Sequence, residues 1–248
     1  EGIDLGSRNF KTIKKPKIGL LVGDGVRSYD AGEIWYIMDR QYNIPITKID
    51  TRILERLNLE KYTHFIFPSF TGDLSSKTLN KIKSWIEKGG TLILYREAIK
   101  WAKRNHLIEI EIIENELIAE NVDFVDRTNF KKAQSISGAI FKANLDRTHP
   151  INFGIENNSI SLFRNTDIFI KPDNESYNNP IKYDKNPLIS GYTSKENLKT
   201  LSNTVPFKIQ SIKNGRVIIM TDNTNFRGYW IGTQHFLANM IFYSNFMN

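Results

Sequence analysis

The sequence contains no cysteine, and this absence excludes several functions at once. Without a thiol the chain forms no disulfide, and it cannot carry out acyl transfer through a thiolate nucleophile. The lack of disulfides is compatible with either a reducing or an oxidising compartment. The sequence also lacks any run of about 18 apolar residues, so we expect no membrane span.

The composition is otherwise that of a soluble globular protein. The 248 residues are 40% hydrophobic and 25% charged, and a chain of this length buries a full core as one large domain or one domain with an insertion. The first residue is Glu1, and no secretory signal follows it. We therefore expect a fragment or mature piece of a longer polypeptide.

The net charge of +7 raises the question of a nucleic-acid partner. Lys and Arg are scattered among Asp and Glu, and the densest basic cluster, residues 11–17, is short. A phosphate-binding face needs basic residues concentrated in one place, and no nucleic-acid-binding motif is present. We expect no nucleic-acid partner, and the sequence points to no cofactor or metal.

Short apolar runs alternate with helical patterns at both ends of the sequence. Strands are predicted at residues 17–23, 46–50, 64–68, 91–95, 207–212 and 216–221, and helices at residues 31–42, 75–88, 97–104 and 233–246. Residues 214–215 (Asn-Gly) indicate a hairpin turn between the last two strands. Alternating strands and helices with short connections favour a parallel sheet covered on both faces. We predict an α/β, flavodoxin-like, doubly wound sheet.

The middle of the chain follows a different pattern. Apolar and acidic residues alternate over 108–118, which suits an exposed strand pair, and residues 138–145 and 161–171 also read as strands. The Asn- and Pro-rich residues 173–184 indicate a surface loop. We interpret residues 1–248 as one domain. Its core lies at 17–104 and 207–246, with a β-rich insertion at about 105–206.

Two loops are expected at the carboxyl edge of this sheet, where ligands bind in open α/β folds. The glycine loop of residues 23–33 follows the first strand and opens a helix, so its backbone N–H groups suit a small anion. Residues 221–233 follow the last strand. There Asp222 and Arg227 are candidates for a pair, and Tyr229 with Trp230 for an apolar wall.

Two catalytic alternatives have weaker signals. His106 and Glu109 match a His-x-x-Glu zinc pattern, with His149 or His235 as a third ligand, but the chain shows no carboxylate placed to activate water. We interpret the match as fortuitous. A hydrolase based on Ser69 or Ser28 lacks the Gly-x-Ser-x-Gly turn.

Three stretches together resemble a known family. Residues 22–35 (VGDGVRSYDAGEIW), 148–154 (THPINFG) and 222–233 (DNTNFRGYWIGT), with Asn239, are similar to a glutamine-amidotransferase-like domain. This domain is found C-terminal to the catalytic domain of some bacterial zinc carboxypeptidases. The resemblance extends from about residue 17 to residue 246.

The resemblance implies an accessory or binding domain without catalytic residues. Amidotransferases of this superfamily carry a nucleophilic Cys at the turn after residues 91–94, where this chain has Tyr95 and Arg96. The implied partners are an upstream zinc peptidase domain and a peptide or glycan ligand, in a secreted, periplasmic or cell-surface protein. The candidate cleft residues are Asp24, Ser28, Tyr29, Glu33, Tyr95, Arg96, Asp222, Arg227 and Trp230. A stand-alone hydrolase and an anion sensor at the glycine loop are the alternatives.

Overall fold

The computed structural model describes residues 6–7, 12–13, 15–115 and 119–247. Its centre is a six-stranded sheet in the order β10-β11-β4-β3-β1-β2. The strands are β1 (Ile18–Val22), β2 (Thr47–Asp50), β3 (His64–Phe67), β4 (Thr91–Tyr95), β10 (Phe207–Ile212) and β11 (Gly215–Met220). All neighbours pair in parallel except β10 with β11. The predicted doubly wound α/β sheet is confirmed.

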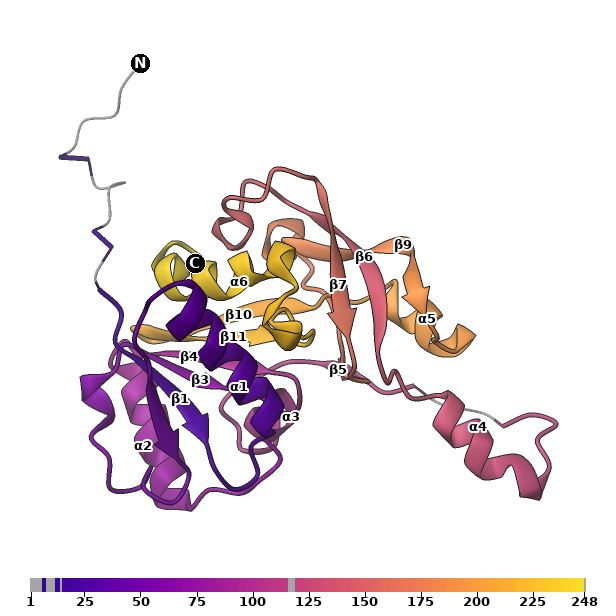
Figure 1. Ribbon diagram of the computed structural model, residues 1–248, viewed down its shortest axis with the longest axis horizontal. Helices are drawn as coiled ribbons and strands as arrows, with labels where there is room; N and C mark the ends of the chain where they lie inside the picture. The colour runs from indigo at the N-terminus through magenta and orange to yellow at the C-terminus, as the bar shows by residue number, and fades with distance from the viewer. Residues whose placement is uncertain (1–5, 8–11, 14, 116–118, 248) are drawn as a thin grey trace.

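Helices cover both faces of this sheet because its strands are apolar on both sides (Figure 1). Helices α2 (Ser76–Glu87) and α3 (Glu97–Arg104) contribute to one apolar core, and α1 (Ser28–Tyr36) and α6 (Ile231–Phe242) to the other. Neighbouring strand residues divide between the two cores. On β3, for example, Phe65 belongs to the first core and Ile66 to the second.

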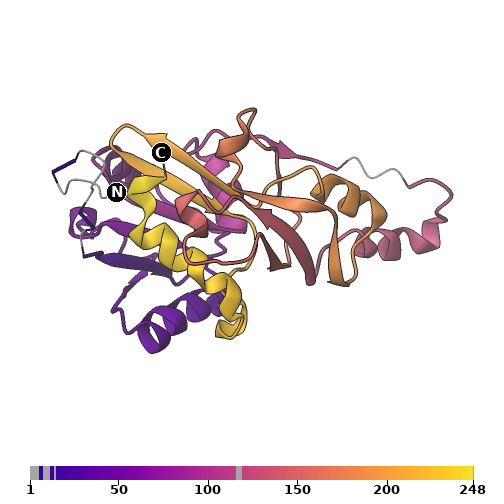
Figure 2. The same cartoon turned by 90° about the horizontal axis from the view of Figure 1, so that it is seen from above.

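The middle of the chain folds as a second, antiparallel sheet in the order β7-β6-β9. Its strands are β6 (Ala139–Leu145), β7 (Ser159–Arg164) and β9 (Ile181–Gly191), and a two-stranded sheet pairs β5 (Ile112–Ile113) with β8 (Phe169–Ile170). Phe141, Leu162 and Tyr183 of the second sheet share one core cluster with α1 and α6. The three-stranded sheet therefore packs against the α1 and α6 core, while Ile170 of β8 belongs to the α2 and α3 core; Figure 2 shows the insertion beside the main sheet.

Several boundaries in this insertion differ from the predictions. The strand pair expected at 108–118 reduces to β5, since Ile108 is buried in the core, and residues 116–118 lie outside the described part. The strand expected at 161–171 is interrupted between β7 and β8. The loop expected at 173–184 ends when β9 begins at Ile181. Two short helices, α4 (Arg127–Ala133) and α5 (Lys195–Leu201), were not predicted.

Two boundaries in the main sheet region also differ from the predictions. The first helix begins at Ser28 and closes with a π-helical turn, Ile37–Gln41. The hairpin turn is residues 213–214 rather than 214–215, because Gly215 already pairs with Ile212 in the ladder. A side chain at Gly215 would collide with the backbone of α2 at Ile86, so this glycine serves close packing.

Candidate functional site

The loops after β1, β3, β4 and β11 meet at the carboxyl edge of the main sheet. The glycine loop after β1 is tied to the segment after β3, since the Arg27 amide donates to the Ser69 carbonyl at 2.9 Å and the Thr71 amide to the Gly25 carbonyl at 3.0 Å. The loop then enters α1. This anchoring fixes the first turn of α1 over the sheet edge.

The sharp turn between β4 and α3 is formed by Arg96. Its backbone has φ 53° and ψ −123°, a conformation that non-glycine residues rarely adopt and that costs about 1–3 kcal/mol. The Arg96 amide is held by the Met220 carbonyl at 3.0 Å. A strained strand-to-helix turn is where some hydrolase folds present a nucleophile. Here the position carries a guanidinium, which is not nucleophilic.

The Arg96 side chain points into the protein and is 4% exposed. Its guanidinium pairs with the buried carboxylate of Asp30 on α1, and it donates to the Asn165 carbonyl at 3.2 Å. The Arg27 Nε lies 3.5 Å from the other oxygen of Asp30. Arg96 therefore links the β4–α3 turn, α1 and the segment after β7. Arg96 was among the residues predicted from the sequence, whereas its partner Asp30 was not.

Asp222 forms a second buried ion pair. The carboxylate is 0% exposed, lies 2.6 Å from Arg164 Nη1 at the end of β7, and accepts from the Tyr183 hydroxyl at 2.7 Å. Burial raises the pKa of Tyr183 well above its usual value. The predicted pairing of Asp222 with Arg227 is therefore wrong. Asp222 directly follows the main-sheet strand β11, whereas Arg164 and Tyr183 belong to the second sheet, so these contacts link the two sheets.

Tyr95 is also an interior residue. It lies in the core on the last position of β4, with its hydroxyl 3.3 Å from Thr224 Oγ1. Burial raises its pKa to about 12. Tyr95, Arg96 and Asp222 thus belong to the supporting layer beneath the sheet edge, and their side chains do not reach solvent.

Of the six remaining candidates, four line an open hollow and two lie outside it. A shallow hollow of about 450 Å³, here called the Glu33 hollow, is lined by Ser28, Tyr29, Gly32, Glu33, Tyr36, Arg227 and Gly228. Tyr29 is 78% exposed. Asp24 and Trp230 do not line it. Asp24 is exposed on the glycine loop, and the Trp230 indole donates to the Ser161 carbonyl at 3.1 Å.

Glu33 joins α1 to the loop after β11. Its carboxylate accepts from Asn223 Nδ2 at 2.8 Å and from the Arg227 amide at 2.7 Å. Burial raises the pKa of Glu33, and the two hydrogen bonds oppose this effect. Arg227 itself has φ 52° and an exposed side chain. The two predicted segments do meet at the sheet edge, and Glu33 is the contact.

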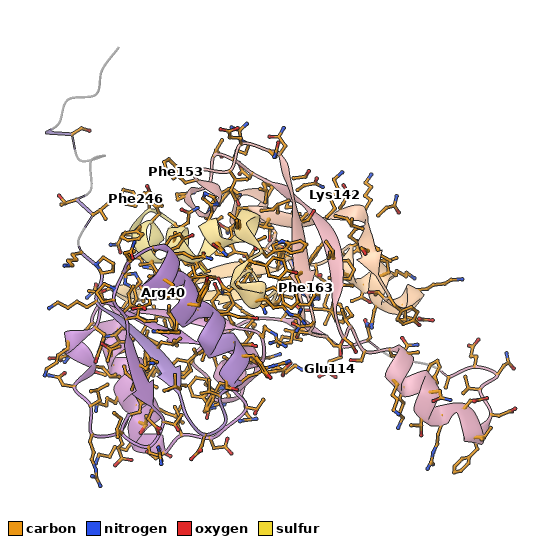
Figure 3. All side chains as sticks on the ribbon, in the orientation of Figure 1. Arg40, Glu114, Lys142, Phe153, Phe163 and Phe246 are labelled. Carbon is orange, nitrogen blue, oxygen red and sulfur yellow. The ribbon has the colours of Figure 1, made fainter. Side chains whose placement is uncertain are left out.

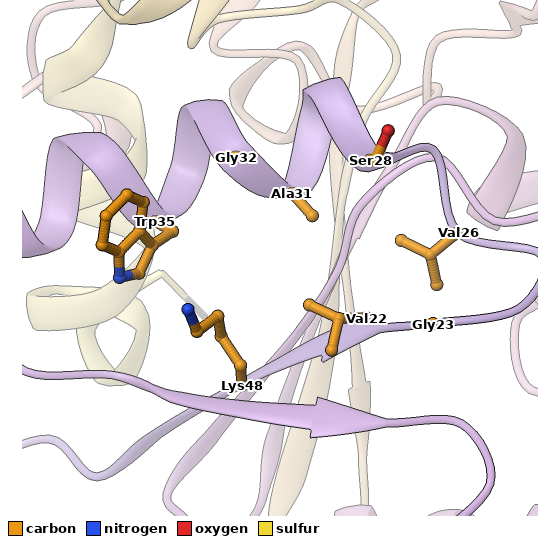
Figure 4. Close-up of a pocket in the computed structure, with 8 residues that line it drawn as sticks. All are labelled: Val22, Gly23, Val26, Ser28, Ala31, Gly32, Trp35 and Lys48. Carbon is orange, nitrogen blue, oxygen red and sulfur yellow. The ribbon is translucent and has the colours of Figure 1, made fainter.

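A second hollow of about 340 Å³ lies on the other flank of α1 (Figure 4). This Trp35 hollow is lined by Val22, Gly23, Val26, Ser28, Ala31, Gly32, Trp35 and Lys48. The Lys48 ammonium, on the edge strand β2, lies 4.9 Å from the centroid of the Trp35 ring. Ser28 and Gly32 line both hollows, so the two are neighbours across the exposed side of α1.

Gly32 is an unusual residue for the interior of a helix. Its φ is not positive, and a Cβ built there has no atom within 4 Å, so neither backbone nor packing requires glycine. Glycine in a helix costs about 0.5–1 kcal/mol relative to alanine. Because Gly32 has no side chain, the helix surface between the two hollows is low, and we call this position the Gly32 saddle. Gly32 was not among the predicted site residues, although a glycine within a helical pattern is a usable signal.

Anion binding by the glycine loop is not favoured by its surroundings. A Cβ at Gly23 would lie 3.0 Å from the carboxyl group of Asp50, so an anion there would meet a carboxylate. Hydrogen bonds from the guanidinium and the backbone amide of Arg52 hold the pKa of Asp50 at about 2, and Asp50 is therefore ionised at neutral pH. Gly25 packs against Gly72 and Phe70, which accounts for that glycine structurally.

Among the described residues, neither a zinc site nor a serine hydrolase site is assembled. In the part of the chain that the structure describes, no group of three or more His, Cys, Asp or Glu side chains is arranged to hold a metal ion. His106 lies on an exposed turn with φ 54°. Ser69 is 5% exposed, and among the described residues no histidine is hydrogen-bonded to it or to Ser28.

Comparisons with known proteins identify the fold. PurLQS from Thermotoga maritima superposes with a TM-score of 0.62 at 10% sequence identity, over 93% of this chain and 100% of that one. A protein described as ThuA-like from Parabacteroides merdae gives a TM-score of 0.56 at 13% identity, over 94% and 90% of the two chains. A β-galactosidase from Bacillus circulans gives 0.53 at 11% identity, covering 93% of this chain but 31% of the larger one.

No family model matches the sequence, and no curated protein matches it. The structural neighbours nevertheless share one architecture, and the chain has a glutamine-amidotransferase-like fold. At these identities the similarity concerns the fold alone. None of the described helices is long and apolar enough to cross a bilayer.

Proposed function

We propose that this chain is a non-catalytic binding domain that uses the exposed side of α1 to hold a peptide or glycan. The observation that carries the proposal is Arg96. The strained turn that presents a nucleophile in some hydrolase folds is filled here by a buried arginine, neutralised by Asp30. The charge at this position stabilises the fold and is not available for catalysis.

The exposed side of α1 offers the chemistry of a shallow recognition surface. Tyr29 and Tyr36 expose aromatic rings, Trp35 is half-buried, and the Glu33 carboxylate and Arg227 guanidinium stand beside them. Aromatic rings pack on the apolar faces of sugars or on peptide side chains, while the charged groups bind hydroxyl, amide or ionic groups. The Gly32 saddle allows one extended ligand to cross both hollows.

We further propose that an upstream zinc carboxypeptidase domain accompanies this domain in a secreted or cell-surface protein. Support comes from the resemblance of the three sequence stretches: the first and last are hydrogen-bonded to each other, and the middle one is hydrogen-bonded to Asn239. Glu33 of the first accepts from Asn223 of the last, and the Asn239 amide donates to the Ile151 carbonyl of the middle one at 2.8 Å. A similar fold also forms part of the larger β-galactosidase chain. Immunoblotting the source cells tests this link, because a native band well above 28.7 kDa is expected.

The alternative of a stand-alone hydrolase has less support, since Ser69 is buried and no described histidine is hydrogen-bonded to it. The decisive assay compares the purified chain and Ser69→Ala for hydrolysis of glutamine, p-nitrophenyl esters and short peptides. We expect no turnover above the buffer rate for either protein. Turnover that disappears in Ser69→Ala would establish the hydrolase instead.

Ligand binding is tested on peptide and glycan arrays with the wild type, Tyr29→Ala and Asp24→Ala. Tyr29 lines the Glu33 hollow, whereas Asp24 is an exposed residue outside both hollows. The proposal predicts a defined set of bound peptides or glycans, lost in Tyr29→Ala and kept in Asp24→Ala. An empty array, or equal binding by all three proteins, would contradict it.

A further inference from the structure

A projecting arm formed by residues 119–135 carries features that the proposed function does not use. It contains the 3-10 turn Phe124–Asp126 and helix α4, and it extends away from both sheets in two orthogonal views (Figures 1 and 2). In the view of Figure 3 its side chains project from the ribbon at the edge of the molecule, and its C-terminal end, at Lys131 and Gln134, lines a hollow together with α3 and β5. No residue of α4 is buried, and Phe124 and Val125 are 77% and 81% exposed.

The base of the arm is fixed to the insertion. The buried side chain of Asn197 on α5 donates to the Gln134 carbonyl and accepts from Asn115 Nδ2 at 2.5 Å. The Ile136 amide donates to Asp167 Oδ1 at 2.8 Å. The arm is thus presented from a hydrogen-bonded base. A helix of seven residues is marginal in water without tertiary packing, so the tip is expected to gain stability from a contact outside the chain.

Charge is divided along the arm. The acidic residues of the first half are Glu120, Asp123 and Asp126, and the basic residues of the second half are Arg127, Lys131 and Lys132. Within the described part of the chain, none of these side chains takes part in an ion pair. The Arg127 guanidinium lies 4.0 Å from the centroid of the Phe124 ring and covers part of it. Phe124 and Val125 lie in the acidic half, next to the boundary between the halves.

From this pattern we propose that the arm binds the arm of a second copy of this chain in a symmetric, antiparallel pair. A two-fold axis near the centre of the arm places the acidic half of each copy against the basic half of its partner. The same axis brings the exposed Phe124 and Val125 of the two copies close to the centre, where they exclude water. An arm alone buries less surface than a standard protein interface, so the dimer is weak and depends on concentration.

Charge reversal tests the pairing in sedimentation velocity runs from about 1 to about 300 μM. The wild type is expected to shift from monomer to dimer over this range. Asp123→Lys/Asp126→Lys leaves Glu120 as the only acidic side chain of the arm, and Lys131→Glu/Lys132→Glu leaves Arg127 as its only basic one, so each variant alone stays monomeric. An equimolar mixture of the two variants is expected to dimerise, since opposite arms again meet.

The matched control is Lys182→Glu/Lys185→Glu, two exposed lysines on β9 that form no ion pair among the described residues. It changes the net charge as much as the acidic arm variant and should dimerise like the wild type. A wild type that remains monomeric throughout would overturn the proposal. So would single variants that still dimerise, or a mixture that stays monomeric although circular dichroism shows both variants folded. The result is independent of ligand binding at α1.

Discussion

The inner and outer sides of helix α1 differ in burial and in how their residues are paired. On the inner side, Asp30 is buried and pairs with Arg96 from the β4–α3 turn. On the outer side, Tyr29 and Tyr36 are exposed, and Gly32 leaves the helix surface bare. The inner side of this helix thus forms a buried ion pair within the protein, whereas its outer side is open to solvent.

The difference separates structural charge from charge that is available to a ligand. A buried ion pair must be satisfied inside the protein, because an isolated buried charge is strongly unfavourable. Exposed aromatic rings and a helical glycine add little or nothing to stability, so their presence points to an external contact. We therefore expect substitutions on the inner side to change stability and those on the outer side to change binding.

The largest effect is expected from Asp30→Ala. Removing this carboxylate leaves the buried Arg96 guanidinium without its ionic partner, at a residue that is already strained. We expect the free energy of unfolding to fall by about 3–5 kcal/mol, measured by urea denaturation. Asp24→Ala removes an exposed carboxylate nearby and should cost less than about 0.5 kcal/mol. Equal losses in the two variants would remove the distinction between the two sides of α1.

An intermediate loss of stability is expected from Glu33→Ala. Glu33 lines the outer hollow, but its carboxylate is also hydrogen-bonded within the protein. The variant loses the hydrogen bonds from Asn223 and the Arg227 amide. It also removes the cost of burying a carboxylate, so we expect a net loss of about 1–2 kcal/mol. Urea denaturation measures this loss, and Glu33→Gln, which keeps an acceptor oxygen, should lose less. A stability loss as large as that of Asp30→Ala would mean that Glu33 acts like the buried residues on the inner side of α1.

The pH dependence of Glu33 sharpens the same point. Burial raises its pKa above 4.5 in the folded protein. A carboxyl group of this kind contributes stability that is fully present below the unfolded pKa and is lost as the pH rises through the folded pKa. The wild type should therefore be most stable relative to Glu33→Gln at about pH 4, with a smaller advantage at about pH 7. An advantage that grows with pH in urea titrations would contradict the cause given for this shift.

The smallest change in stability is expected at Gly32. Gly32→Ala should raise the free energy of unfolding by about 0.5–1 kcal/mol, because alanine favours the helix and its Cβ meets no atom. The same variant should weaken binding on the arrays. Gly232→Ala is the matched control, since a Cβ at this glycine also meets nothing and Gly232 lies outside both hollows. A destabilised Gly32→Ala in thermal melts would indicate a packing role for Gly32.

The main sheet was predictable because its signals are local. Apolar runs such as residues 91–95 and the amphipathic pattern of residues 75–88 determine their own structure, and both appear as predicted. The insertion was harder. Strand β9 contains charged residues and Pro187, which a strand tolerates at the edge of a sheet, and its pairing with β6 has register shifts. Such a strand depends on its partner more than on its own pattern.

The site was predictable only in part, for a related reason. Ser28, Tyr29, Glu33 and Arg227 do line one hollow, because the segments that follow β1 and β11 both leave the sheet at its carboxyl edge and come together there through Glu33. The burial of Arg96 and Asp222 depends on Asp30 and Arg164. Arg164 lies 58 residues before its partner. No local pattern reveals such a pairing, and the same types of residue would equally suit an exposed cleft.

The central claim is that the outer side of α1 is the ligand surface, and comparing Gly32→Leu with Gly232→Leu on the peptide and glycan arrays tests it most directly. Both glycines have open space at the Cβ position, but only Gly32 lies between the two hollows. We predict that Gly32→Leu melts near the wild-type temperature yet loses the bound peptides or glycans, while Gly232→Leu keeps them. Undiminished binding by a folded Gly32→Leu would contradict the account.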